Sequence, residues 1–161
     1  MLFRSTLVRH LLAAHRARTS VIGTTGVSWT GRAGDITLEA THTTPAGPAL
    51  QRLLGDMRDD GVEALAMELS SHALDQGRAA GLDLDIAAWS NLSRDHLDYH
   101  GSMEEYEAAK ARILGETLVA APSARGAVLC VDDPAVARHV DDVTLPVLRV
   151  STVPGTLAEI V

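Results

Sequence analysis

The chain has 161 residues, of which 46% are hydrophobic and 22% are charged, a composition that fits one globular domain with its own core. Its formal net charge of −7 argues against nucleic acid or an anionic membrane as a partner, because both bind basic surfaces. The single cysteine, Cys130, excludes an internal disulfide, and no segment fits a signal peptide or a membrane span, so we expect a cytoplasmic protein.

Apolar spacing predicts that helices and short strands alternate along the chain. We expect helices over residues 5–15, from Pro45 to near Gly61, and over 72–80, 103–114 and 134–140, with strands over 20–24, 35–38, 62–69, 84–89, 127–131 and 147–150. This alternation predicts an α/β fold with a mostly parallel sheet and helices on both faces. Ligands of such sheets bind beyond the carboxyl ends of the strands, where the polar clusters of this sequence fall.

The first polar cluster is Thr-His-Thr-Thr-Pro at residues 41–45, just before a predicted helix. Free N–H groups at a helix N-terminus, together with adjacent hydroxyls, suit a phosphate or a carboxylate. The simpler alternative is that one threonine is an ordinary N-cap.

The second cluster is Met-Glu-Leu-Ser-Ser-His at residues 67–72, where Glu68 ends a predicted buried strand. A carboxylate there is costly unless it is paired or bound to a cation, and magnesium favours such oxygen ligands. The alternative is a solvated glutamate beside a serine that caps the next helix.

The third cluster, residues 91–101, holds two histidines, two aspartates, an arginine and an asparagine after a predicted strand. This composition predicts metal or phosphate chemistry, and zinc is a rival to magnesium because histidine and aspartate also bind zinc. However, the spacing from His96 to His100 lacks the glutamate of a helical zinc-protease motif. Lys110, on the helix that follows, is by itself typical of a surface charge.

Taken in order, these clusters resemble the Mur ligase family. Residues 67–78 are similar to its Glu-x-Ser-Ser-His-Ala-Leu-x-Gln-x-Arg stretch, and residues 91–101, followed by Tyr106 and Lys110, resemble its Asn-Leu-Ser-Arg-Asp-His-Leu-Asp-Tyr-His-Gly signature. Residues 21–26, 43–45 and 132–134 fall at matching places. The resemblance covers nearly the whole chain and is closest to the branch that adds diaminopimelate or lysine to the precursor of the cell wall.

The resemblance implies a P-loop-like central domain that uses ATP and Mg²⁺. Such ligases phosphorylate a carboxylate of UDP-N-acetylmuramoyl dipeptide, and the amine of a diamino acid then attacks the acyl phosphate. By resemblance, Glu68 and His96 bind magnesium, and Lys110 is carbamylated by CO2 to become a third, anionic ligand. The residues implied for substrate binding are His42, Thr43, Thr44, Ser70, Gln76 and Arg78, and those implied for ATP binding are Ser5, Thr6 and Asn91.

The sequence departs from the family before Thr6, where a glycine-rich loop ending in Gly-Lys-Thr is expected. Residues 4–6, Arg-Ser-Thr, resemble the end of that loop, but no glycine and no strand precede them. We therefore expect residues 1–161 to form a single incomplete central domain, without its first strand and phosphate loop and without the N-terminal UDP-binding and C-terminal amino-acid-binding domains. Such a chain is expected to have little activity alone.

Three alternatives stay open beside this reading of the sequence. One is a non-catalytic remnant that binds muramoyl peptide or a partner, such as the missing ligase domains in trans. Another is a relative of folylpolyglutamate synthetase, which shares the ATP-binding design. A zinc hydrolase is the third.

Overall fold

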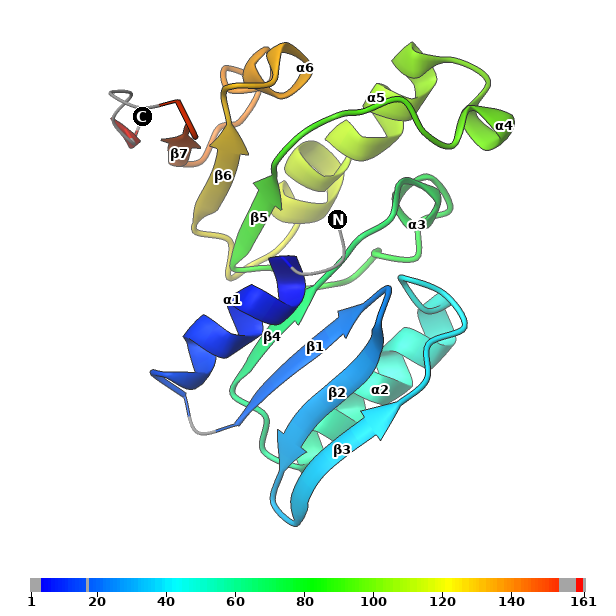
Figure 1. Ribbon diagram of the computed structural model, residues 1–161, viewed down its shortest axis with the longest axis vertical. Helices are drawn as coiled ribbons and strands as arrows, with labels where there is room; N and C mark the ends of the chain where they lie inside the picture. Colours follow the sequence, from blue (N-terminus) through cyan, green and yellow to red (C-terminus); the bar gives the residue numbers. More distant parts are fainter. Residues whose placement is uncertain (1–3, 17, 154–158, 161) are drawn as a thin grey trace. The chain divides into compact units, whose positions relative to one another are not determined.

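The computed structural model describes residues 4–16, 18–153 and 159–160 (Figure 1). The chain divides into two compact units, Met1–Arg78 and Ala79–Val161, which are described separately. Within the described residues, no helix has the length and apolar character needed to cross a membrane.

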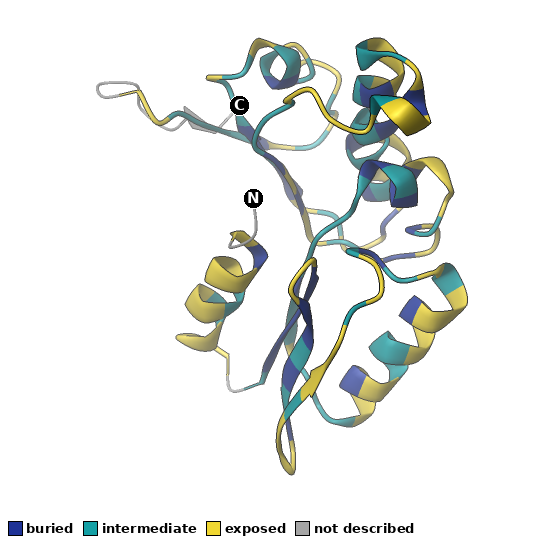
Figure 2. Ribbon diagram, turned by 45° about the vertical axis from the view of Figure 1, so that its right-hand side comes forward, coloured by how far each residue is buried: buried dark blue, intermediate teal, exposed yellow. Residues whose placement is uncertain are grey.

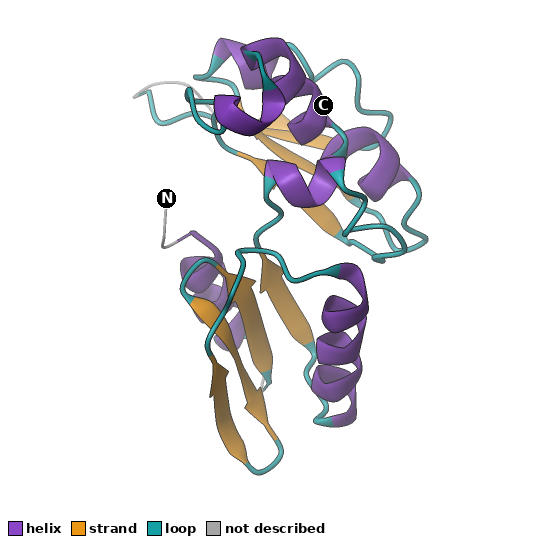
Figure 3. Cartoon of the chain, turned by 90° about the vertical axis from the view of Figure 1, so that its right-hand side faces the viewer, coloured by secondary structure: helices purple, strands orange, loops and turns teal. Residues whose placement is uncertain are grey.

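The first unit is built on a four-stranded sheet in the order β3-β2-β1-β4. Its elements are α1 (Arg4–Ala13), β1 (Thr19–Gly23), β2 (Gly26–Gly31), β3 (Gly34–Leu38), α2 (Gly47–Asp59), β4 (Ala64–Met67) and α3 (Ser71–Asp75). α1 and α2 lie on opposite faces of the sheet (Figure 3). All five residues of β1 are buried, as expected for an inner strand (Figure 2).

The second unit has its own four-stranded sheet, in the order β5-β6-β7-β8. Its elements are β5 (Ile86–Trp89), α4 (Leu97–His100), α5 (Met103–Ala111), the π-helical turn η1 (Ile113–Thr117), β6 (Gly126–Cys130), α6 (Pro134–Ala137), β7 (Val147–Val150) and β8 (Glu159–Ile160). β5, β6 and β7 are parallel, and β8 is antiparallel to β7. The core of this unit includes Trp89, Leu114, Leu118, Leu129 and Val136.

The α/β class is confirmed, but the first sheet is less parallel than the sequence pattern predicted. β1 is parallel to β4, whereas β2 is antiparallel to both β1 and β3. Short turns at residues 24–25 and 32–33 join β1, β2 and β3 into an antiparallel meander. The segment Gly26–Gly31, not expected to be a strand, alternates buried and half-buried residues as β2.

Several predicted helices are shorter than expected, among them the one predicted over residues 134–140, which ends at Ala137. The helix predicted over residues 72–80 ends at Asp75, and Gly77 follows with a positive φ of 66°, a conformation that suits glycine after a helix. The helix predicted over residues 103–114 ends at Ala111 and continues into the π-helical turn η1.

Candidate active site

Glu68 directly follows β4, and its carboxylate is held from two sides within the first unit. The Ser5 hydroxyl, near the start of α1, donates to Oε1 at 2.6 Å. The backbone N–H and the hydroxyl of Thr24, in the turn after β1, donate to Oε2 at 3.2 and 2.9 Å. Three donors thus fix both carboxylate oxygens, and a half-buried carboxylate needs such partners.

Gly23 makes room for this carboxylate at the end of β1. A Cβ atom at position 23 would lie 2.9 Å from Cδ of Glu68 and 3.0 Å from its Oε1. Any side chain there would therefore displace the carboxylate or the strand. In the sequence, Gly23 stands out only as part of a matching stretch, because its role depends on Glu68, 45 positions later in the chain.

Thr44 links the loop before α2 to the loop after β4. Its side chain is 1% exposed; the hydroxyl donates to the Glu68 carbonyl at 2.9 Å and accepts from the Ser70 N–H at 3.0 Å. Ser70 in turn caps α3 by accepting from the Ala73 N–H, as the capping alternative for this segment predicted. The corresponding alternative for residues 41–45 is wrong, because the N-cap of α2 is Ala46, whose side chain makes no capping bond.

Arg78 joins the same group of residues. Its Nη1 donates to the Thr44 carbonyl at 3.0 Å, and its Nε and Nη2 donate to Oε1 of Gln76 at 2.9 and 2.5 Å. Thr43 contacts the Thr24 hydroxyl at 3.1 Å, while the exposed His42 is bonded to its neighbour Thr41. Of the six residues expected to bind substrate, five therefore lie in a network connected to Glu68, whereas the hydrogen bond of the His42 ring is to Thr41, outside it.

Ser5 and Thr6 differ in their surroundings, although both begin α1. Ser5 is buried against Glu68, whereas Thr6 is exposed and lines a separate hollow of about 140 Å³. Arg9 also lines this hollow and donates to the Ser28 hydroxyl at 2.7 Å. Only Ser5 is therefore in contact with the carboxylate cluster.

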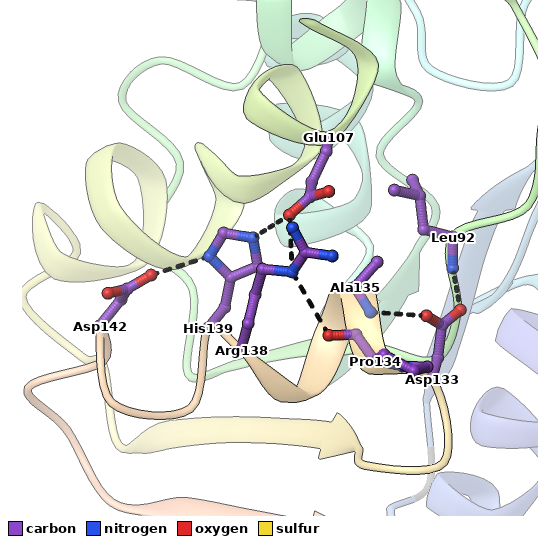
Figure 4. A network of polar contacts seen from close by, with 8 residues as sticks. All are labelled: Leu92, Glu107, Asp133, Pro134, Ala135, Arg138, His139 and Asp142. Carbon is purple, nitrogen blue, oxygen red and sulfur yellow. Dashed lines mark hydrogen bonds and ion pairs between the residues drawn. The ribbon is translucent and has the colours of Figure 1, made fainter. Parts of the chain in front are cut away.

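In the second unit, the loop after β5 is anchored at its first residues. Oδ2 of Asp133 accepts from the Leu92 N–H at 2.6 Å, and Oδ1 of the same residue accepts from the Ala135 N–H at 2.9 Å as the N-cap of α6 (Figure 4). The Trp89 indole N–H donates to the Asn91 carbonyl at 3.1 Å. The side-chain oxygen of Asn91 accepts from Ser90, so the amide of Asn91 is oriented locally.

His96 lies in the left-handed region, with φ 55°, and is the one non-glycine residue with positive φ in the described part of the chain. Such a conformation persists where the surroundings hold it. Its N–H is bonded to the carboxylate of Asp95 at 2.9 Å, and its ring lies edge-on to the Tyr106 ring at 6.0 Å. Burial, and the nearby Asp95, raise the pKa of Tyr106, so its phenol is neutral at pH 7.

Lys110 is one turn of α5 beyond Tyr106, and its Nζ lies 5.3 Å from the centre of the Tyr106 ring. Tyr106 thus contacts both residues of this unit that the resemblance assigns to the metal, His96 and Lys110. The composition holds a further signal for this residue, because Lys110 is the only lysine in the chain. All other strongly basic side chains are arginines, which do not react as amines.

A second polar network connects α5 to the segment after β6 (Figure 4). The ring of His139 is 3.0 Å from Oε1 of Glu107 through Nε2 and 2.8 Å from Oδ2 of Asp142 through Nδ1, and it stacks on Trp89 at 5.2 Å. Arg138 is 3.5 Å from the same oxygen of Glu107. These contacts hold the fold together, because they join α5, through Glu107, and β5, through Trp89, to the residues that directly follow α6.

Asp132 performs a similar task at the ends of β6 and β7. It accepts hydrogen bonds from the Ser151 hydroxyl and, at 2.7 Å, from both the N–H and the hydroxyl of Thr152. These bonds, the Ser151 one foremost, lower the pKa of Asp132 to about 2. Cys130, which stands where the family pattern has asparagine, contributes its thiol at 3.8 Å.

The expected metal ligands are divided between the units: Glu68 belongs to the first, and His96 and Lys110 to the second. Among the described residues, no three or more His, Cys, Asp or Glu side chains form a group able to hold a metal ion. The zinc alternative for residues 91–101 therefore lacks a ligand set within that loop. In the first unit, the oxygens of Ser5 and Glu68 are the hard ligands that magnesium prefers.

The sequence matches the Mur ligase middle domain family over residues 5–156. It is 42% identical over 153 residues to the UDP-N-acetylmuramoyl-L-alanyl-D-glutamate–2,6-diaminopimelate ligase of Geobacter metallireducens, covering 94% of this chain and 29% of the relative. It is 50% identical over 127 residues to the ligase of the same name from Pseudomonas putida, covering 79% of this chain and 24% of that relative.

A solved structure of a UDP-N-acetylmuramoyl-L-alanyl-D-glutamate–2,6-diaminopimelate ligase is also similar, with a TM-score of 0.75 and 35% identity over 94% of this chain and 30% of that one. The chain thus spans less than a third of the length of these relatives. Because the family match includes nearly all of the residues that build both clusters, the chain belongs to the Mur ligase family, in the part that forms its middle domain.

Proposed function

We propose that this chain supplies the ATP-using middle domain of a cytoplasmic ligase that joins diaminopimelate to UDP-N-acetylmuramoyl-L-alanyl-D-glutamate. The names of the relatives support this choice of substrates over lysine. The observation that carries the proposal is the carboxylate of Glu68, fixed by Ser5 and Thr24 at the carboxyl end of β4. The UDP-binding and amino-acid-binding parts are supplied outside residues 1–161, in the same polypeptide or in trans.

In the first unit, five of the six proposed substrate ligands share one connected network with Glu68, a proposed metal ligand, and with Ser5. Ser5 and Glu68 present oxygens to Mg²⁺, which when bound neutralises the phosphates of ATP. Thr24 keeps Glu68 in place, so that little reorganisation is needed when the cation arrives.

Recognition of the muramoyl dipeptide is assigned to the residues that surround Thr44. The guanidinium of Arg78 suits a carboxylate or a phosphate, and Gln76 orients it. Thr43, the neighbour of Thr44, and Ser70, whose N–H bonds to Thr44, supply further hydroxyls. His42 is included in the proposal because it lies in the same loop as Thr43.

In the second unit, His96 and carbamylated Lys110 are the proposed metal ligands. Asn91 of this unit, together with Ser5 and Thr6 of the first unit, is proposed to contact the nucleotide. Tyr106 contacts both His96 and Lys110, which supports the assignment of the two residues to one site.

The test is titration calorimetry of the folded chain with ATP and Mg²⁺, comparing Glu68→Gln with Glu63→Gln. These glutamates flank β4, one after its carboxyl end and one before its amino end, so they form a matched pair. We expect saturable, magnesium-dependent binding that Glu68→Gln weakens about tenfold or more and Glu63→Gln leaves unchanged.

Absence of ATP binding by a folded chain would contradict ATP use by these residues. Titration with UDP-N-acetylmuramoyl dipeptide then distinguishes the alternative, binding without catalysis. That alternative predicts a saturable signal which Arg78→Ala removes and Arg58→Ala, on the exposed surface of α2, does not.

A further inference from the structure

The ring of Tyr106 lies beside both proposed metal ligands of the second unit, His96 and Lys110, and beside His100. It is 4% exposed and lies on α5, with Lys110 one turn later. The Lys110 Nζ is 5.3 Å from the ring centre, within the distance at which an ammonium is attracted to an aromatic face. The rings of His96 and His100 lie 6.0 and 5.3 Å away.

The aromatic face distinguishes between two chemical forms of Lys110. The face of a phenol ring carries partial negative charge, so it attracts a cation and repels an anion. Carbamylation turns the cationic side chain into an anion. The position seen here, over the ring, therefore suits the ammonium and does not suit the carbamate.

We propose that Tyr106 is a positioning residue that holds Lys110 over its buried ring until CO2 adds, and that the carbamate then leaves the ring. The inference deepens the proposed function and rests on the carbamylation of Lys110 that it includes. Tyr106 also contacts His96, so the ring keeps both side chains near the place where the metal is proposed to bind.

The covalent step is balanced by CO2 and water alone. The Lys110 ammonium first gives a proton to water, and the lone pair of Nζ attacks the carbon of CO2. An N–C bond forms, one C=O electron pair moves onto oxygen, and the nitrogen loses a second proton to water. The products are the carbamate anion and two hydronium ions, and no oxidant or reductant takes part.

The test exploits the fact that Lys110 is the only lysine. In the full chain, lysine labelled with ¹³C at Cε gives one side-chain signal, and ¹³C-bicarbonate reports the carbamate. We expect the Cε protons to show contacts with the Tyr106 ring and an upfield ring-current shift. Both are expected to disappear as bicarbonate is raised and the carbamate signal grows.

Three variants make the comparison specific. Tyr106→Leu removes the aromatic face and is expected to raise the carbamate-to-amine ratio at a fixed bicarbonate concentration about two- to fivefold. Tyr106→Phe keeps the ring and is expected to behave as the wild type. Lys110→Arg identifies the carbamate formed on the N-terminal amine. Circular dichroism verifies that each variant is folded. If Tyr106→Leu does not fold, the ring contacts of Lys110 in the wild-type chain, with and without bicarbonate, still test the proposal.

The outcomes separate this inference from the proposed function. Equal carbamate ratios in the folded Tyr106→Leu and wild-type chains, or ring contacts that persist in the carbamate, would overturn the role of Tyr106 and leave carbamylation standing. No carbamate in any variant, at high bicarbonate with Mg²⁺, would overturn the carbamylation of Lys110 and this inference with it.

Discussion

The two polar clusters of this chain are held in different ways. In the first unit, the Glu68 carboxylate is fixed by directional hydrogen bonds from Ser5 and Thr24, which are 63 and 44 positions away in sequence. In the second unit, Lys110 of α5 and His96, the residue before α4, lie against the one aromatic ring of Tyr106. Hydrogen bonds select one position, whereas an aromatic face tolerates sliding.

This difference fits the chemistry proposed for each cluster. Glu68 is proposed to bind the cation as an unmodified carboxylate, so a rigid arrangement would lower the cost of binding. Lys110 is proposed to become a ligand only after CO2 adds, and in that proposal its side chain moves between two positions. Each unit has one tryptophan, Trp29 in β2 and Trp89 in β5, so its stability can be followed separately.

The largest expected effect is on Asp133, which anchors the loop after β5 in the second unit. Asp133→Ala removes the acceptor for the Leu92 N–H and the N-cap of α6 together, and is expected to lower the free energy of unfolding by about 3 kcal/mol. Urea denaturation followed by Trp89 fluorescence, in a Trp29→Phe background, measures it. Asp133→Asn retains a capping oxygen and is expected to cost about 1 kcal/mol. Equal losses for the two variants would contradict the double role of Asp133.

The next effect tests whether Glu68 is rigidly held. Gly23→Ala places a methyl group 2.9 Å from Cδ of Glu68, and is expected to cost about 2 kcal/mol in the first unit and to weaken magnesium binding about tenfold. Trp29 fluorescence in a Trp89→Phe background and calorimetry measure the two effects. Gly55→Ala, inside α2 with nothing within 4 Å, is the control and is expected to stabilise by about 0.5–1 kcal/mol. If Gly23→Ala left magnesium binding unchanged, Glu68 would be more mobile than its hydrogen bonds indicate.

Much of the fold follows from local patterns, and its exceptions have identifiable causes. The buried runs of β1 and β6 and the cap of α3 at Ser70 are visible in the sequence, since burial and capping depend on neighbouring residues. β2 was not predicted although Gly26–Gly31 alternates in character, and the glycines at both of its ends are residues that weaken a strand pattern. The early end of α3 depends on the backbone conformation of Gly77, which a count of apolar spacing does not include.

The candidate site was predictable in its residues and not in its geometry. The resemblance to the family named Glu68, His96 and Lys110, but the partners of Glu68 lie 44 and 63 positions away and share no local pattern with it. Tyr106 was quoted as part of a motif without a role, since its contacts with His96 require the fold. That Lys110 is the only lysine was visible in the sequence, yet it is hidden when lysine and arginine are counted together.

A smaller effect is expected from the framework on which Lys110 rests. Glu107→Gln keeps the shape of the side chain and weakens its contacts with His139 and Arg138, at an expected cost of about 1 kcal/mol. Trp89 stacks on His139, so its fluorescence reports this change directly. Glu104→Gln, exposed in the first turn of α5, is the control and is expected to cost a few tenths of a kcal/mol. Equal effects at the two positions would mean that the buried network adds nothing to the framework.

The smallest effect concerns Asp132, whose carboxylate lies on the surface and ties the end of β6 to residues 151–152. The pKa of this carboxyl is about 2 in the folded chain, lowered from its ordinary value of 3.8, so the unfolded chain binds more protons between these two values. Its contribution to stability is therefore present above about pH 4 and is lost as the pH falls through 2. In urea denaturation followed by Trp89, we expect wild type to be more stable than Asp132→Asn at pH 6 and the two to converge towards pH 2. A difference that stayed constant with pH would show that Asp132 acts through shape and not through charge. Convergence would instead show that the charged carboxylate of Asp132 stabilises the turn after β6 by accepting hydrogen bonds from residues 151–152, the same kind of contact that fixes Glu68 in the first unit.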